Sequence, residues 1–73
     1  MNSSRTNASR SDFSQRQLQI LQGMVEGKTN HELASDLGFS VSTIRHETMR
    51  IYELLQASER REAVVLAKKL DLI

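Results

Sequence analysis

Apolar residues recur every three or four positions in four separate stretches of this 73-residue chain, the spacing typical of amphipathic helices. The first stretch predicts a helix from about residue 15 to residue 25. Ser14 is followed three residues later by Gln17, which is a capping-box pattern, and Phe13 occupies the staple position before the cap. Gly27 ends this helix. Its apolar residues are Leu18, Leu21 and Val25 on one stripe, with Ile20 and Met24 beside it.

Two further stretches lie on either side of the short connection Gly38-Phe39-Ser40. Before the connection, Thr29 or Asn30 can cap a second helix, and Glu32 favours its first turn electrostatically. Gly38 supplies the backbone conformation that stops the helix. The apolar residues of this helix are Leu33, Ala34 and Leu37.

The stretch after the connection predicts a longer helix that Ser40 or Ser42 can cap and that reaches about residue 55. At about 100° per residue, a buried stripe and an outward face separate on this helix. The buried stripe consists of Ile44, Thr48, Ile51 and Leu55. The outward face consists of Ser42, His46, Met49 and Glu53, flanked by Arg45 on one side and by Thr43 and Arg50 on the other.

The three-residue connection contains a glycine and forces these two helices to cross steeply. This is the geometry of a helix-turn-helix, which presents its second helix to the major groove of DNA. The sequence therefore predicts an all-α fold whose helix over about 41–55 faces DNA.

A fourth helix is predicted from near Ser58, where Ser58 precedes the acidic Glu59 in a capping pattern. Its core stripe consists of Ala63, Leu66, Ala67 and Leu70. Val65 lies on the opposite side of the helix, between Arg61 and Lys69. A single exposed valine is normal on a protein surface, and in so short a helix the alternative is a second contact surface.

Residues 1–12 are mostly serine, asparagine and arginine with almost nothing to bury, so we expect a disordered arm or linker there. Residues 13–73 suffice for one small domain. Cysteine is absent and the two histidines lie far apart, so neither a disulfide nor a metal site is predicted. No apolar run approaches the roughly 20 residues of a membrane span, and no signal peptide is recognisable, which predicts a soluble protein of a reducing compartment.

Ten lysines and arginines stand against nine acidic residues, which gives a net charge of +1. Binding to nucleic acid must therefore depend on a local basic face. The chain has no Ser, His and acid constellation that so small a helical domain could enclose, and Gly27-Lys28-Thr29 lacks the upstream glycine and strand of a Walker motif. We expect no catalytic residue, no cofactor, no small-molecule ligand and no membrane partner.

From Phe13 onward the sequence resembles the C-terminal DNA-binding domain of the LuxR/FixJ family, also called NarL or GerE, of bacterial transcription regulators. The resemblance rests on Gly-Lys-Thr-Asn-x-Glu-Leu-Ala over 27–34, followed about ten residues later by Ser-Thr-Ile-Arg over 42–45. Further matching segments are Ser14-Gln15-Arg16-Gln17-Leu18, Leu37-Gly38-Phe39-Ser40, Ala63-Val64 and Leu72-Ile73. The residues that depart from the usual family pattern are Gln17, Glu47, Thr48 and Gln56-Ala57.

The resemblance implies a four-helix domain in which the third helix enters the major groove and the fourth pairs two copies on a near-palindromic site. Its base-reading positions match Arg45, His46 and Met49, with Ser42 close by. Its backbone-contacting positions match Lys28, Asn30, Thr43 and Arg50. An arginine can contact guanine O6 and N7 together, and a methionine can meet the methyl group of thymine.

Structural alternatives stay open for several of these residues. Arg45 can be a solvated flank of the helix, and Asn30 would cap a helix whatever the function. Arg50 can pair with Glu47 or Glu53 on its own helix instead of with a phosphate. We expect the Thr48 hydroxyl to bond back to the preceding turn.

The expected partners are double-stranded DNA and a second copy of the chain, with Val65, Arg61 and Lys69 at the dimer interface and RNA polymerase as a further candidate. The expected location is the nucleoid in a bacterial cytoplasm. An alternative hypothesis is a protein-interaction module that pairs with another regulator and modulates it, which the near-neutral charge and the acidic residues Glu47 and Glu53 favour.

Overall fold

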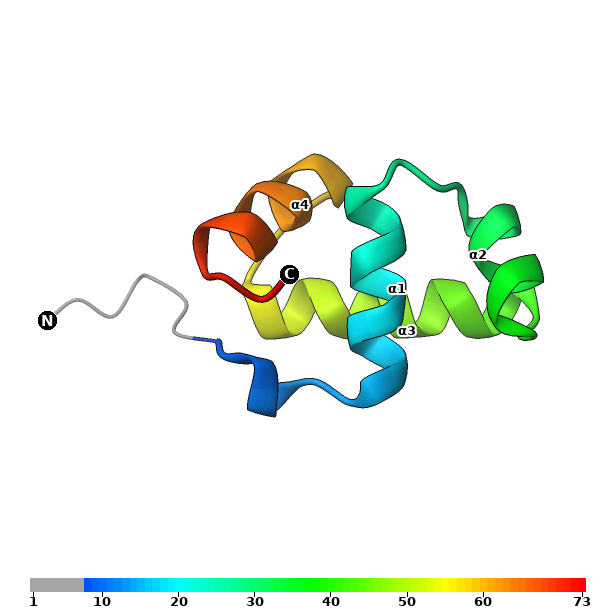
Figure 1. Ribbon diagram of the computed structural model, residues 1–73, viewed down its shortest axis with the longest axis horizontal. Helices are drawn as coiled ribbons and strands as arrows, with labels where there is room; N and C mark the ends of the chain where they lie inside the picture. The colour runs from blue at the N-terminus through cyan, green and yellow to red at the C-terminus, as the bar shows by residue number, and fades with distance from the viewer. Residues whose placement is uncertain (1–7) are drawn as a thin grey trace, which may run out of the picture.

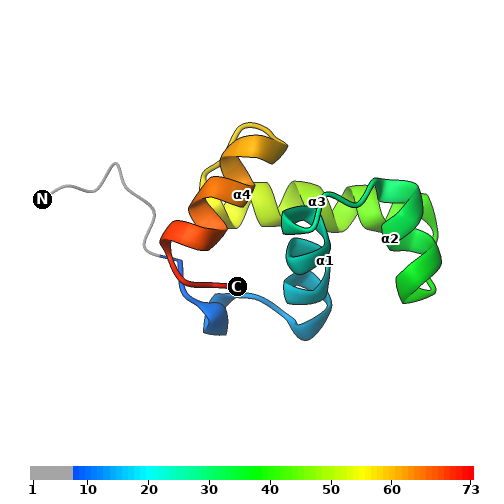
Figure 2. The same cartoon turned by 45° about the horizontal axis from the view of Figure 1, so that its top comes forward.

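The computed structural model describes residues 8–73, and this part of the chain is all-helical, which confirms the predicted fold class. Its elements are the 3-10 helix η1 (Arg10–Asp12) and the α-helices α1 (Gln15–Val25), α2 (Asn30–Leu37), α3 (Val41–Leu55) and α4 (Arg60–Lys69). Helix α3 is the longest, and α1 crosses its middle while α2 and α4 lie towards its two ends (Figure 1; Figure 2). No helix in the described part is long and apolar enough to cross a membrane.

Helix α1 begins as the sequence predicts. The Ser14 hydroxyl accepts a hydrogen bond from the Gln17 backbone N–H at 3.0 Å, and the Gln17 side-chain oxygen accepts one from the Ser14 N–H at 2.9 Å. Phe13 is buried before the cap. The residues of α1 that are most buried are Ile20, Leu21, Gly23 and Met24, whereas Leu18 and Val25 are only half-buried. The predicted stripe is thus displaced, because α1 packs against both α3 and α4 and buries a broader side.

Gly23 allows α2 to approach α1. A Cβ atom built on Gly23 would collide with the Cδ2 atom of Leu33, a fully buried residue of α2 that has little room to move. The sequence gives no sign of this role, because the close neighbour lies ten residues away in another helix.

The structure shows which of two candidate residues caps α2 and which of two caps α3. Thr29 caps α2: its hydroxyl accepts from the Glu32 N–H at 3.1 Å, and the Glu32 carboxylate accepts from the Thr29 N–H at 2.8 Å. Asn30 is therefore the first helical residue and not the cap. Ser40 caps α3 by accepting from the Thr43 N–H at 3.1 Å. Gly38 ends α2 at a φ of 77°, a left-handed conformation that glycine adopts without strain.

Helix α4 begins differently from the prediction. Glu59, and not Ser58, is its cap, and the Glu59 carboxylate accepts from the backbone N–H groups of Arg61 and Glu62. The backbone N–H and the hydroxyl of Ser58 instead donate to the Glu62 carboxylate at 2.8 and 2.9 Å. The Arg60 side chain donates to the Lys28 carbonyl oxygen, which ties the start of α4 to the loop after α1.

Order extends further towards the N-terminus than the sequence predicts. Within the segment expected to be a disordered arm, η1 forms, and the Arg10 guanidinium donates to the Leu72 carbonyl oxygen at 2.5 Å. This partner lies 62 positions away, so local sequence could not indicate it. Residues 1–7 of the expected arm lie outside the described residues.

The core sits where α1, α3 and α4 meet. The predicted buried stripe of α3 is confirmed, since Ile44, Ile51 and Leu55 are fully buried and Thr48 is nearly so. The Thr48 hydroxyl donates to the Ile44 carbonyl oxygen at 2.7 Å, as predicted. The other buried apolar residues are Phe13, Ile20, Leu21, Met24, Leu33, Ala34, Ala63, Ala67 and Leu72.

Candidate nucleic-acid interface

The side of α3 opposite its buried stripe is open to solvent. It carries four residues singled out from the sequence as base contacts: Ser42, Arg45, His46 and Met49, which we call the outer face of α3. All four are exposed, and Met49 keeps 59% of its surface accessible. The buried stripe packs α3 against the rest of the domain and leaves this face on the solvent side of the helix.

Arg45 is exposed and has no ion-pair partner among the described residues. Within the part of the chain that the structure describes, no acidic side chain lies within ion-pair distance of its guanidinium. An exposed guanidinium with no ion-pair partner keeps its planar set of donors for a planar pair of acceptors such as guanine O6 and N7.

Two residues predicted to contact phosphate are already paired with carboxylates. The Lys28 Nζ atom lies 2.6 Å from Asp36 Oδ2 and 3.8 Å from Glu26 Oε1. The pKa of Lys28 is raised, chiefly by its hydrogen bond to Asp36 and next by the negative charge of that carboxylate. The Arg50 Nε atom lies 3.6 Å from Glu53 Oε1 on the same helix. DNA would have to compete with these pairs for both cations.

The other two predicted phosphate contacts lie at helix starts. Asn30 and Thr43 are half-buried in the first turns of α2 and α3. The Thr43 hydroxyl accepts from the Ser40 hydroxyl at 3.0 Å and still has its own hydrogen to donate. Backbone amides in the first turn of a helix favour an anion such as phosphate.

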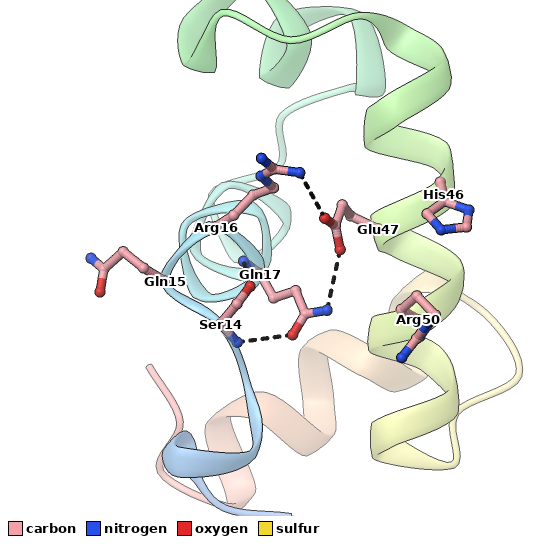
Figure 3. Close-up of a pocket in the computed structure, with 7 residues that line it drawn as sticks. All are labelled: Ser14, Gln15, Arg16, Gln17, His46, Glu47 and Arg50. Atoms are coloured by element: carbon pink, nitrogen blue, oxygen red, sulfur yellow. Dashed lines mark hydrogen bonds and ion pairs between the residues drawn. The ribbon is translucent and has the colours of Figure 1, made fainter.

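Glu47 points away from the outer face. Its side chain is only 14% exposed and reaches across to α1, where it meets Arg16 and Gln17 (Figure 3). These residues line an open groove of about 510 Å³ together with Ser14, Gln15, His46 and Arg50. From the sequence, either Glu47 or Glu53 could pair with Arg50. In the structure Arg50 pairs with Glu53, and Glu47 pairs with Arg16 of α1.

The outward side of α4 carries the three residues predicted for a second contact surface. Val65 keeps 56% of its surface accessible, and Arg61 and Lys69 are exposed beside it. Ala63 and Ala67 are buried on the opposite side of the same helix. Apart from Met49, Val65 is the only large apolar residue of the described chain that is exposed.

Comparison with known proteins gives consistent matches. The family described as bacterial regulatory proteins, luxR family, matches residues 11–67. The chain is 36% identical over 66 residues to the transcriptional activator protein EsaR of Pantoea stewartii subsp. stewartii, an alignment that covers 90% of this chain and 26% of that protein.

Two proteins of Bacillus subtilis (strain 168) are also similar. The transcriptional regulatory protein LiaR is 33% identical over 61 residues, which cover 84% of this chain and 29% of that protein. The uncharacterized transcriptional regulatory protein YxjL is 38% identical over 55 residues, which cover 75% of this chain and 25% of that protein. The chain therefore spans about a quarter of the length of the curated relatives it matches.

Proposed function

Because this chain belongs to the luxR family of bacterial regulatory proteins, whose domain binds DNA and regulates transcription, we propose that α3 reads the major groove and that α4 pairs two copies on one DNA site. The observation that carries this proposal is the outer face of α3, where Arg45 stands exposed without an acidic partner among the described residues.

The chemistry of the outer face suits the edges of base pairs. The Arg45 guanidinium fits guanine O6 and N7, and the exposed Met49 side chain fits the methyl group of thymine. His46 and Ser42 supply hydrogen-bonding groups beside them. The proposed readers are therefore Arg45, His46, Met49 and Ser42.

Phosphate contacts set the register of the helix on the duplex without reading sequence. We assign them to Lys28 and Arg50, which exchange their carboxylates for phosphates, and to Asn30 and Thr43 at the helix starts. The first-turn amides of α2 and α3 support the same phosphates. The DNA that the proposed contacts would bind is chromosomal DNA in the bacterial cytoplasm.

Pairing through α4 doubles the few base pairs that one α3 can read. Val65 forms the apolar centre of the proposed interface, with Arg61 and Lys69 at its edge. A two-fold arrangement of protein requires a two-fold symmetric DNA site, with half-sites about one helical turn apart.

Selection from a random-sequence duplex pool at two salt concentrations tests the proposal directly. A two-fold symmetric motif should be enriched, and binding should weaken as salt rises. Recovery of no enriched sequence would contradict the proposed reading of bases.

Substitution of Arg45 by alanine should remove sequence preference. We expect the ratio of affinities for the selected and a scrambled duplex to fall by about 5- to 150-fold, since a bidentate base contact contributes about 1–3 kcal/mol of discrimination. Lys28→Ala is the matched control, because losing a phosphate contact should weaken both duplexes by the same factor. Equal losses on both duplexes for Arg45→Ala would contradict the assignment.

The exposed Val65 also separates this proposal from an interaction module that pairs with another regulator. Val65→Glu should leave the fold intact, prevent self-association in sedimentation equilibrium, and reduce affinity for the two-fold site while affinity for a single half-site stays the same. If the variant bound the full site as the unchanged protein does but no longer captured a partner regulator, the interaction module would be favoured.

A further inference from the structure

We propose that Arg16 and Gln17 of α1 act through Glu47 as positioning residues that fix α3 relative to α1, and that this fixed position is required for the outer face to discriminate between DNA sequences. The contact of these three side chains is called the Glu47 clamp below. The functional part of this inference rests on the proposed reading of DNA by α3.

Glu47 uses both of its carboxylate oxygens on α1. Oε2 accepts from the Arg16 guanidinium and Oε1 accepts from the Gln17 side-chain amide, each at 3.1 Å (Figure 3). The Glu47 side chain is only 14% exposed and that of Arg16 is 46% exposed, so water screens their attraction less than that of a fully solvated pair. Two partners on adjacent residues hold the carboxylate in position more firmly than one would.

Gln17 joins two structural roles in one side chain. Its oxygen accepts from the Ser14 N–H and completes the cap of α1, while its nitrogen donates to Glu47. A glutamate at this position would serve the cap but would place a second carboxylate against Glu47. The neutral amide is the group that satisfies both ends.

Arg16 extends the clamp to the turn before α3. Its guanidinium carbon lies 4.5 Å from the ring centroid of Phe39, in the connection between α2 and α3. A planar guanidinium can stack on a ring and pair with a carboxylate at the same time, which a lysine cannot reproduce. Arg16 therefore touches both the turn that leads into α3 and the middle of α3 itself.

No other ion pair in residues 8–73 connects α3 with another helix. Arg50 and Glu53 lie on the same helix, and Lys28 pairs with Glu26 and Asp36. Glu47 directly follows Arg45 and His46 in sequence, so movement at the clamp is transmitted to two residues of the outer face.

The test is a double-mutant cycle with Arg16→Ala, Glu47→Ala and the combined variant, with Arg16→Lys as the conservative change. Affinities are measured for the selected and a scrambled duplex. Each single variant should lose at least about fivefold in the ratio of the two affinities, and the combined variant should lose little more, because both changes break one unit. Arg16→Lys should recover discrimination only in part.

Glu53→Ala is the matched control for loss of a carboxylate from α3. Glu53 is 70% exposed and its partner lies on its own helix, so both duplexes should bind more tightly by the same factor. If Glu47→Ala behaved in this way, Glu47 would merely repel DNA and the proposal would be overturned. Equal weakening of both duplexes by Arg16→Ala would make Arg16 a phosphate contact and would also overturn it.

Amide hydrogen exchange of the free proteins tests the clamp without DNA. Exchange at Phe39 and in the first turns of α3 should be several-fold faster in Arg16→Ala and Glu47→Ala, while α4 should be unaffected. Unchanged exchange would overturn the clamp whatever the DNA result. If exchange changed as expected but the unsubstituted protein showed no sequence preference, the clamp would stand and the proposed reading of DNA would fail.

Discussion

Gln56 ends α3 in a backbone conformation that side chains disfavour. Its φ of 58° and ψ of 37° lie in the left-handed region, where a residue that has a Cβ atom is destabilised by roughly 1–2 kcal/mol. The Gln56 N–H reaches the Glu53 carbonyl oxygen at 3.2 Å and the Ala57 N–H reaches that of Tyr52 at 2.9 Å, so the conformation completes the helix end. The strain is the cost of that ending.

We therefore expect Gln56→Gly to increase the free energy of unfolding by about 0.5–1 kcal/mol, since relief of the strain exceeds the extra entropy of glycine in the unfolded chain. Urea denaturation measures the change. Gln19→Gly, at an exposed position within α1, is the matched control and should decrease stability by about the same amount. A loss of stability for Gln56→Gly would contradict the account of strain.

At the scale of a helix, the start of α4 depends on a contact with a distant residue, and neighbouring residues alone did not predict it. Ser58 and Glu59 are adjacent and both can accept from first-turn amides, so the sequence favoured the serine. The Arg60 side chain is anchored on the Lys28 carbonyl oxygen, 32 positions earlier, and this contact helps to decide where the helix begins. For α1, where Ser14 and Gln17 satisfy each other within four residues, the same reasoning gave the start correctly.

The start of α4 should also respond to pH. The backbone N–H and the hydroxyl of Ser58 donate to the Glu62 carboxylate and lower the pKa of this group below its ordinary value of 4.5. A depressed pKa in the folded state means that the stabilisation is present above 4.5 and is lost as the pH falls through the lowered pKa.

We therefore expect Glu62→Gln to lower the melting temperature at pH 7, and the difference from the unsubstituted protein to shrink as the pH falls below 4.5 and past the lowered pKa. Thermal unfolding followed by circular dichroism across this range measures it. A difference that stayed constant from pH 7 to acid would contradict a role for the ionised carboxylate.

For the whole molecule, the sequence predicted the four helices and the buried stripe of α3 because these follow from local periodicity. Helix geometry also placed Ser42, His46 and Met49 together on the outward side of α3 with Arg45 at its flank, and all four are exposed. The sequence missed contacts that link distant positions, such as Glu47 with Arg16 and Gly23 with Leu33. The pairing of Lys28 with Asp36 belongs to the same class, because both ends depend on how α2 packs.

Acidic residues offset nearly all the positive charge of the molecule, and Asp36 is paired directly with one of its cations, Lys28. Asp36→Asn removes the nearer of the two carboxylates that Lys28 contacts, so affinity for selected and scrambled duplexes should rise equally, by about two- to fivefold, with a steeper dependence on salt. Fluorescence anisotropy at several salt concentrations measures both quantities.

Asp71→Asn is the matched control for this prediction. It changes the net charge by the same amount, and asparagine tolerates the positive φ of this position, which lies after α4. Its effect on affinity should be clearly smaller. Equal gains for the two variants would indicate that only the total charge matters.

The hydrogen bond from Arg10 to the Leu72 carbonyl oxygen places the two ends of the described chain side by side. A few glycines could therefore join Ile73 to Ala8 at little entropic cost, and a circularly permuted chain could be opened at the connection between α3 and α4. All four helices would stay whole in a new order along the polypeptide. A fusion partner attached at the new opening would sit beside the first turn of α4, so the pairing of two copies could be blocked without altering any residue that faces DNA.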